Sequence, residues 1–243
     1  MSETQPKSRV GDWAAVVFAL VLPTFVTLLY FVWAEGYAPA VQQGSYAVGK
    51  IVQFCFPLVW VCLVLKQRPQ IWPWTSRGVG TGIVFGLLIA AAMFALYHGW
   101  LKTSDLYANA EGAVQEKISG LDLDLNSFIV VGIFYSLIHS LLEEYYFRWF
   151  IYGQLKRLVS FWPAAIISGL GFMAHHVIVL AKYFDYFSPT TWLFAAAIAI
   201  GGVAWAWLYE RSGSLLGPWV SHLLVDAAIF AIGYEIIRNL VGS

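Results

Sequence analysis

Long apolar segments separated by short polar ones run along the whole chain. A helix that crosses a membrane needs roughly 20 mainly apolar residues. The segments that meet this requirement are residues 13–34, 47–65, 79–100, 127–153, 162–182, 191–209 and 215–238. The pattern predicts an all-α fold, a polytopic membrane helical bundle of about seven transmembrane helices. We expect residues 1–243 to form a single integral membrane domain.

The polar stretches between these segments are mostly short. The first twelve residues form a polar tail, and the apolar run after them is long and has no small-residue cleavage site. We therefore expect an uncleaved first span rather than a signal peptide. The longest polar stretch, residues 102–126, is expected to be a loop.

The composition supports a membrane protein. Only 12% of the residues are charged, against about 25% in soluble domains. The 17 Phe, 13 Tyr and 12 Trp residues suit the aromatic belts at membrane interfaces. The formal net charge is zero, so we expect no nucleic acid as a partner. The apolar segments indicate the lipid bilayer as a partner. Cys55 and Cys62 lie about two helical turns apart, beyond disulfide reach, and are expected to be packing thiols.

The distribution of Lys and Arg predicts an orientation. With a cytoplasmic N-terminus, the inner segments hold Lys7, Arg9, Lys66, Arg68, Arg77, Lys156, Arg157 and Arg211. The outer segments hold Lys50, Lys102, Lys117, Lys182 and Arg238. Positive charge prefers the cytoplasmic side, so we expect the N-terminus there. We expect an integral protein of the plasma (inner) membrane of a prokaryote, which the compact length fits.

Three predicted spans carry ionisable side chains. They are His139, Glu143, Glu144 and Arg148 in the fourth span, His175 and His176 in the fifth, and His222 and Asp226 in the seventh. Such residues are costly within a bilayer and usually functional. The structural alternatives are a buried ion pair that fixes helix register and hydrogen-bonded packing histidines.

Helical spacing sorts these residues. Glu144 and Arg148 are four apart and can pair on one helical face, whereas Glu143 points about 100° away and is left for another role. His222 and Asp226 are also four apart and share a face. We expect His139 to be only a neighbour of Glu143.

The candidate residues of the three spans lie at a similar predicted depth in the bilayer. Counted from the predicted cytoplasmic ends of their spans, Glu143, His176 and His222 lie at about 17–20 Å, near the middle of a bilayer. Scattered structural polar residues have no reason to share a depth. We therefore favour a functional site.

The motifs E-E-x-x-x-R, F-x-x-x-H and H-x-x-x-D occur in this order within the predicted spans. They comprise Glu143, Glu144, Arg148, Phe172, His176, His222 and Asp226. This trio resembles the CPBP family, the CAAX proteases and bacteriocin-processing enzymes, also called the Abi family. The family includes the Ras-converting CAAX endopeptidase. The resemblance covers about residues 127–230, which would be the catalytic core.

The resemblance implies a glutamate-type intramembrane endopeptidase. It would hydrolyse a peptide bond in a membrane-associated protein or peptide substrate, prenylated or not. By analogy, Glu143 and His176 would activate a water, and His222 with residue 226 would stabilise the oxyanion. Peptide hydrolysis needs such a base and such a hydrogen-bond donor. No cofactor and no metal are implied.

The remaining motif residues would support this chemistry. By the same analogy, Glu144 and Arg148 would hold the first acid in place. Position 226 is Asp, where many family members have Asn. An ionised Asp cannot donate to an oxyanion. Asp226 is therefore either protonated or orients His222, and we prefer orientation.

Two other functions are compatible with the same residues. Glu143, His176 and His222 could ligate zinc in a metal-dependent intramembrane protease, with a water as fourth ligand. A non-catalytic transporter or scaffold could also have the same fold. Transporters often show repeats or broken helices, and the sequence shows neither.

A glycine pattern opens the third predicted span. Gly78, Gly82 and Gly86 form a G-x-x-x-G-x-x-x-G face. Such faces let two membrane helices approach closely, so we expect helix packing here.

Overall fold

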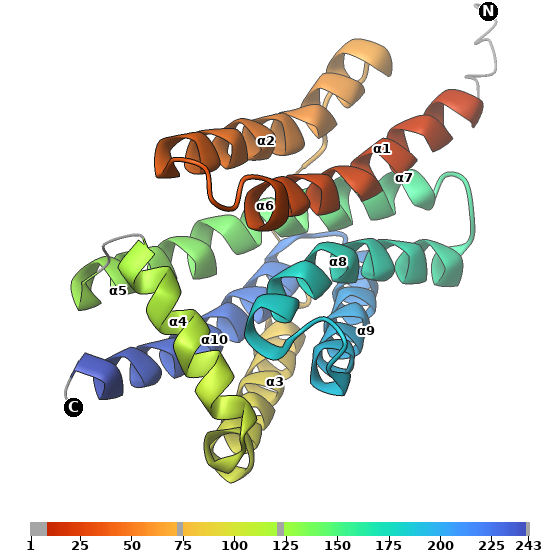
Figure 1. Ribbon diagram of the computed structural model, residues 1–243. Helices are drawn as coiled ribbons and strands as arrows, with labels where there is room; N and C mark the ends of the chain where they lie inside the picture. Colours follow the sequence, from red (N-terminus) through yellow and green to blue (C-terminus); the bar gives the residue numbers. More distant parts are fainter. Residues whose placement is uncertain (1–8, 72–74, 121–123, 242–243) are drawn as a thin grey trace, which may run out of the picture. The chain divides into compact units, whose positions relative to one another are not determined.

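The computed structural model describes residues 9–71, 75–120 and 124–241, which form helices joined by short connections (Figure 1). In chain order the helices are α1 (Arg9–Leu28), η1 (Leu29–Trp33), α2 (Pro39–Val59), η2 (Trp60–Val64), α3 (Val79–Gly99), η3 (Leu101–Thr103), α4 (Leu106–Gly120), α5 (Leu125–Phe134), η4 (Tyr135–His139), α6 (Ser140–Glu144), η5 (Tyr145–Tyr152), α7 (Gly153–Leu155), α8 (Phe161–Phe184), α9 (Pro189–Ser212) and α10 (Leu216–Val241). η3 is a 3₁₀ helix, and η1, η2, η4 and η5 are π-helical.

Seven helical stretches of the described residues are long and apolar enough to cross a membrane. They are Val10–Trp33, Pro39–Val64, Val79–Thr103, Leu125–Leu155, Phe161–Phe184, Pro189–Ser212 and Leu216–Asn239. The prediction of an all-α membrane bundle with about seven spans is confirmed.

The predicted start of the second span, residue 47, was eight residues too late. The helix begins at Pro39, where the fixed φ of proline suits the first helical position. Its first turns carry polar side chains, so the pattern of apolar residues did not indicate the start of the helix. One of them, Gln42, donates from Nε2 to the carbonyl oxygen of Tyr30 at 2.8 Å.

The prediction of a loop over residues 102–126 is wrong. Most of this stretch is α4, a 15-residue helix. Its sequence, LYANAEGAVQEKISG, is rich in Ala, Glu, Gln and Lys, which are good helix formers. Polarity therefore indicated exposure here, not irregular structure. Asp124 then starts α5 as an N-cap, accepting from the Ser127 backbone N–H at 2.8 Å.

Contacts divide the chain into two compact units. The first unit comprises residues 1–71, 145–179 and 193–206, and the second comprises residues 72–144, 180–192 and 207–243. The boundary cuts the fourth span between Glu144 and Tyr145. The two units are described separately below.

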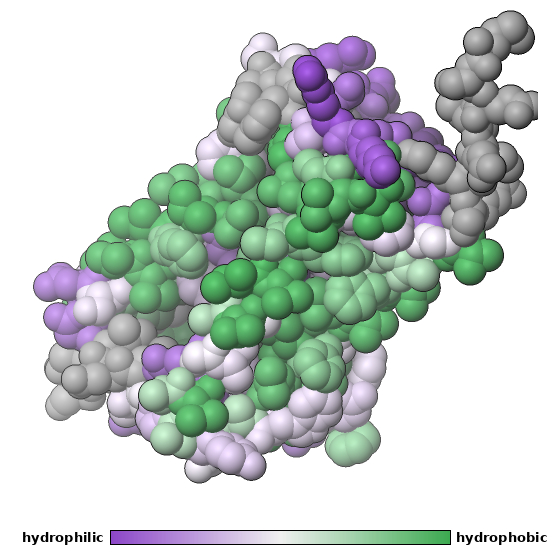
Figure 2. All heavy atoms as spheres, turned by 90° about the horizontal axis from the view of Figure 1, so that it is seen from above, coloured by the Kyte–Doolittle hydropathy of each residue, from purple (hydrophilic) through white to green (hydrophobic). Residues whose placement is uncertain are grey.

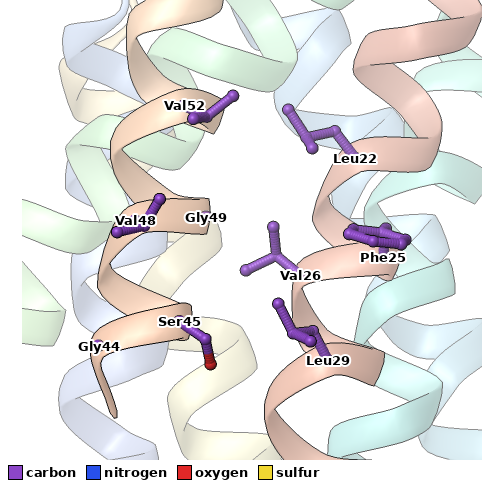
Figure 3. Close-up of a pocket in the computed structure, with 9 residues that line it drawn as sticks. All are labelled: Leu22, Phe25, Val26, Leu29, Gly44, Ser45, Val48, Gly49 and Val52. Carbon is purple, nitrogen blue, oxygen red and sulfur yellow. The ribbon is translucent and has the colours of Figure 1, made fainter. Parts of the chain in front are cut away.

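In the first unit, α1 and α2 pack against each other. The two helices approach closely at Gly49, where a Cβ atom would lie 2.8 Å from Val26. Figure 3 shows Val26 directed toward the helix that carries Gly49, and both residues line an apolar groove. Apart from Ser45, only apolar side chains and glycines line this groove. It holds none of the ionisable residues of the candidate site.

In the second unit, α3 and α10 pack closely through the predicted glycine face (Figure 1). A Cβ atom on Gly82 would collide with the backbone of Gly217. A Cβ atom on Gly86 would lie 2.8 Å from the carbonyl oxygen of Ser221. The prediction of close helix packing is confirmed, and its partner is the helix that carries His222.

The Gly82→Ala variant should lower the stability of the protein by about 1–3 kcal/mol, the usual cost of overpacking. The added methyl meets rigid backbone rather than a side chain that can move. The matched control is Gly80→Ala on the same helix, where a Cβ atom has nothing within 4 Å. Thermal unfolding in detergent measures both, and an equal midpoint for the two variants would contradict the packing.

The exposed surface is strongly apolar. Large apolar side chains such as Leu63, Leu88 and Ile200 are each at least 65% exposed. Large parts of the face shown in Figure 2 are hydrophobic. Soluble monomers rarely expose contiguous apolar patches of more than a few hundred Å². With its seven spans, the chain is an integral membrane protein.

Candidate active site

The two adjacent acids lie in a short α-helical interval between π-helical segments. Glu143 and Glu144 end the five-residue α6, which follows η4 and precedes η5. Both are buried, at 3% and 0% exposure. Each π-helical turn shifts the angular position of the residues after it, and such turns are frequent at functional sites. The directions of the two acids therefore depend on η4 as well as on α-helical spacing.

The imidazole of His222, on α10, is the centre of the polar cluster in the second unit. Its Nδ1 makes a 2.8 Å hydrogen bond to Oε1 of Glu144. Its Nε2 lies 3.7 Å from Oε2 of Glu143 and 3.6 Å from Oδ1 of Asp226. One buried imidazole thus contacts three carboxyl groups from two helices.

The hydrogen bond to Glu144 indicates which nitrogen of the His222 ring carries a proton. Because an ionised carboxylate only accepts hydrogen bonds, Nδ1 of His222 donates to Glu144. In a neutral ring, Nε2 then carries the lone pair, and in a charged ring it carries a second N–H. The distances of 3.6 and 3.7 Å from Nε2 exceed a direct hydrogen bond. At this range the ring and the two carboxyl groups still interact electrostatically.

His139 lies one helical turn before Glu143. Its Nδ1 is 3.9 Å from Oε2 of Glu143, so this oxygen lies near two imidazoles. The sequence predicted His139 as a neighbour of the acid, and it is placed as one.

Asp226 should tolerate replacement by Asn better than by Ala. Both roles considered for it, orienting His222 and donating to an oxyanion, survive in an amide of the same shape, whereas Ala removes the group. We expect Asp226→Asn to retain at least about tenfold more turnover than Asp226→Ala, which corresponds to roughly one hydrogen bond. Equal losses in the two variants, measured as turnover per folded enzyme, would contradict both roles.

In the first unit, Arg148 is enclosed by aromatic rings. The guanidinium carbon is 4.8 Å from the ring centre of Phe172 and 5.0 Å from that of Trp205. Nη2 donates to the carbonyl oxygen of Gly202 at 3.4 Å. The arginine is fully buried, and such a desolvated cation is attracted to aromatic faces. This explains the phenylalanine of the F-x-x-x-H motif, which packs on the arginine of the E-E-x-x-x-R motif.

The two adjacent histidines of α8 have different surroundings in the same unit. Nδ1 of His176 lies 2.8 Å from the carbonyl oxygen of Phe172. A carbonyl only accepts, so Nδ1 carries the proton and Nε2 the lone pair in the neutral ring. His175 is buried and stacks on Phe147, with ring centres 5.7 Å apart. The prediction that His176, rather than His175, faces the acids stays a prediction.

The second unit thus brings together four predicted site residues, Glu143, Glu144, His222 and Asp226. Arg148 and His176 belong to the first unit. Their roles beside the acids stay predictions.

Some partners could not be predicted from the sequence. Spacing within one helix suggested Arg148 as the partner of Glu144, but it says nothing about contacts between helices, such as the hydrogen bond from His222 to Glu144. Gly202 and Trp205 around Arg148 were not predicted either. Their only signal in the sequence is that Gly202 precedes Trp205 by three residues, which places both on one face of a helix.

In the part of the chain that the structure describes, no group of three or more His, Cys, Asp or Glu side chains is arranged to hold a metal ion.

Comparison with known proteins identifies the region that carries the motifs. Residues 125–228 match the family described as "Type II CAAX prenyl endopeptidase Rce1-like". The resemblance proposed from the three motifs is confirmed, and so is the prediction of a peptidase, a hydrolase that acts on peptide bonds.

A relative supports this assignment over more of the chain. Across 217 residues the chain is 24% identical to a protein of Bacillus subtilis (strain 168) named "Putative membrane peptidase YdiL". The match covers 88% of this chain and 84% of that protein. No solved structure matches the chain.

Proposed function

We propose that this CAAX-family protein is an intramembrane endopeptidase. It cleaves a peptide bond of a membrane-associated protein or peptide, with a water activated by Glu143 and His176. The single observation that best supports this is the buried cluster of Glu143, Glu144 and Asp226 around the His222 imidazole. A purely structural role does not need three carboxyl groups around one imidazole.

In the first step, the carboxylate of Glu143 accepts a proton from water, and the water oxygen attacks the carbonyl carbon of the scissile bond. His176 assists by accepting a hydrogen bond from this water at Nε2, since its Nδ1 proton is directed to Phe172. A buried carboxylate that must take and return a proton is a suitable general base.

In the second step, the negative charge that develops on the carbonyl oxygen needs a donor. The charged form of His222 supplies its Nε2–H, while the hydrogen bond from Nδ1 to Glu144 fixes the ring. A preorganised donor at this position contributes strongly to catalysis. Glu143 then returns its proton to the leaving amine, and the peptide bond breaks.

Arg148 supports this chemistry from a distance. The aromatic rings of Phe172 and Trp205 hold its guanidinium, and it follows Glu144 by four residues. Its charge would balance that of Glu144.

We further propose that the protein lies in the plasma (inner) membrane of a prokaryote with its N-terminus in the cytoplasm. The excess of Lys and Arg in the inner segments supports this orientation. Reporter fusions at the two ends test it, and with seven spans they should report opposite compartments.

The function is tested by comparing newly formed protein N-termini in membranes of cells that express wild-type protein or Glu143→Gln. We expect cleavage products that depend on Glu143. A fluorogenic peptide built on such a site then allows the reaction to be measured with purified enzyme. Activity should persist in a chelator such as EDTA, whereas the zinc alternative requires its loss. An identical set of N-termini in both strains would contradict the proposal.

A further inference from the structure

The backbone of η4, just before the acids, is held by two side-chain hydrogen bonds. The Ser140 hydroxyl donates to the carbonyl oxygen of Ser136 at 2.5 Å. The Trp219 indole donates from Nε1 to the carbonyl oxygen of Leu137 at 3.0 Å. Backbone groups at membrane depth must find partners within the protein, and π-helical turns disturb the regular i→i−4 pattern. These two side chains therefore stabilise the π-helical turn.

The two hydrogen bonds differ in the sequence separation of donor and acceptor. Ser140 belongs to the same helical span as its acceptor, so it fixes local geometry only. Trp219 comes from α10, 82 positions away in the sequence. Its bond therefore fixes one helix relative to another.

Trp219 also lies three residues before His222, about one helical turn. Two hydrogen bonds then join α10 to the acid segment within the second unit. One runs from Trp219 to the π-helical turn, and the other from His222 to Glu144. The π-helical turn determines the angular direction of the acids, and α10 determines the position of the imidazole. The hydrogen bond of the Trp219 indole links η4 to α10.

We propose that Trp219 is a positioning residue of the peptidase site. By holding the carbonyl of Leu137, it fixes the register between His222 and the two acids. The inference rests on the proposed endopeptidase function, since it concerns the geometry of the same groups. Trp219 belongs to none of the three motifs and touches no reacting atom.

The test is Trp219→Phe, which keeps an aromatic ring but loses the N–H donor. The chain offers a matched control. Trp192, at the start of α9, donates its indole N–H to the carbonyl oxygen of Tyr186 at the same 3.0 Å. Trp192→Phe therefore removes the same kind of bond without touching η4 or α10.

Kinetics are measured on the detergent-purified enzyme with the fluorogenic peptide, and rates are normalised to monodisperse protein. A displacement of about 1 Å at a catalytic group can lower a rate by about 100-fold. We expect Trp219→Phe to lower kcat by about 10- to 100-fold and to leave KM within about twofold. Trp192→Phe should change kcat by less than about twofold. The pH profile of Trp219→Phe should also shift, because the surroundings of the imidazole change.

The inference is overturned if Trp219→Phe keeps wild-type kcat, if it changes only KM, or if Trp192→Phe loses as much. Glu143→Gln is measured in parallel. An inactive Glu143→Gln together with a fully active Trp219→Phe would reject the positioning role alone. An active Glu143→Gln would reject the proposed function itself.

Discussion

Replacing Glu143 by Gln should abolish cleavage and leave the protein folded. The amide has nearly the same shape and still fits the space 3.7 Å from Nε2 of His222. It cannot, however, accept the proton of the attacking water at any working pH. General-base catalysis is worth about 10²–10⁴-fold in rate. We expect a loss of turnover of at least this size.

The measurement is single-turnover cleavage of the fluorogenic peptide, together with thermal unfolding in detergent. The unfolding midpoint should stay close to that of the wild-type protein. Wild-type cleavage by Glu143→Gln would exclude Glu143 as the base. A large loss of stability would mean that this acid is a structural residue.

Glu144→Gln should lower both stability and activity. Glu144 is fully buried and accepts the Nδ1 hydrogen bond of His222. It also precedes the buried Arg148 by one helical turn, so an amide removes the charge expected to balance the guanidinium. Breaking a buried ion pair on one side costs about 3–5 kcal/mol in soluble proteins. We expect a destabilisation of this order, and a loss of turnover because His222 is held less firmly.

The matched comparison is the neighbouring Glu143→Gln, which removes one carboxylate charge from the same short helix. When turnover and stability are measured for both variants, they distinguish a catalytic role from a structural one. If Glu143→Gln were severely destabilised and Glu144→Gln were not, the roles of the two acids would have to be exchanged.

The spans were predictable because a bilayer imposes one strong requirement, a long run of apolar residues. All seven apolar segments correspond to helices, and the largest error, at Pro39, arose where polar residues occupy the first turns of a helix. The polar helix α4 was missed for the related reason that hydropathy does not distinguish an exposed helix from a loop.

The cluster around His222 was predictable as a set of residues but not as a set of contacts. Spacing indicated that Glu143 and Glu144 point in different directions, and the motifs selected His222 and Asp226. The hydrogen bond between Glu144 and His222 joins residues 78 positions apart. This bond depends on helix packing and on π-helical turns, and neither can be predicted from the periodicity of the sequence.

The packing of α10 on α3 and on the acid segment also bears on how the protein is made. The ribosome synthesises the glycine face of α3 and both acids well before it reaches His222, which comes 78 residues after Glu144. During this interval the two carboxyl groups lack their imidazole. If His222 supplies the oxyanion donor as we propose, hydrolytic activity appears only after α10 has entered the membrane and docked, and chains that stall before this point are inactive.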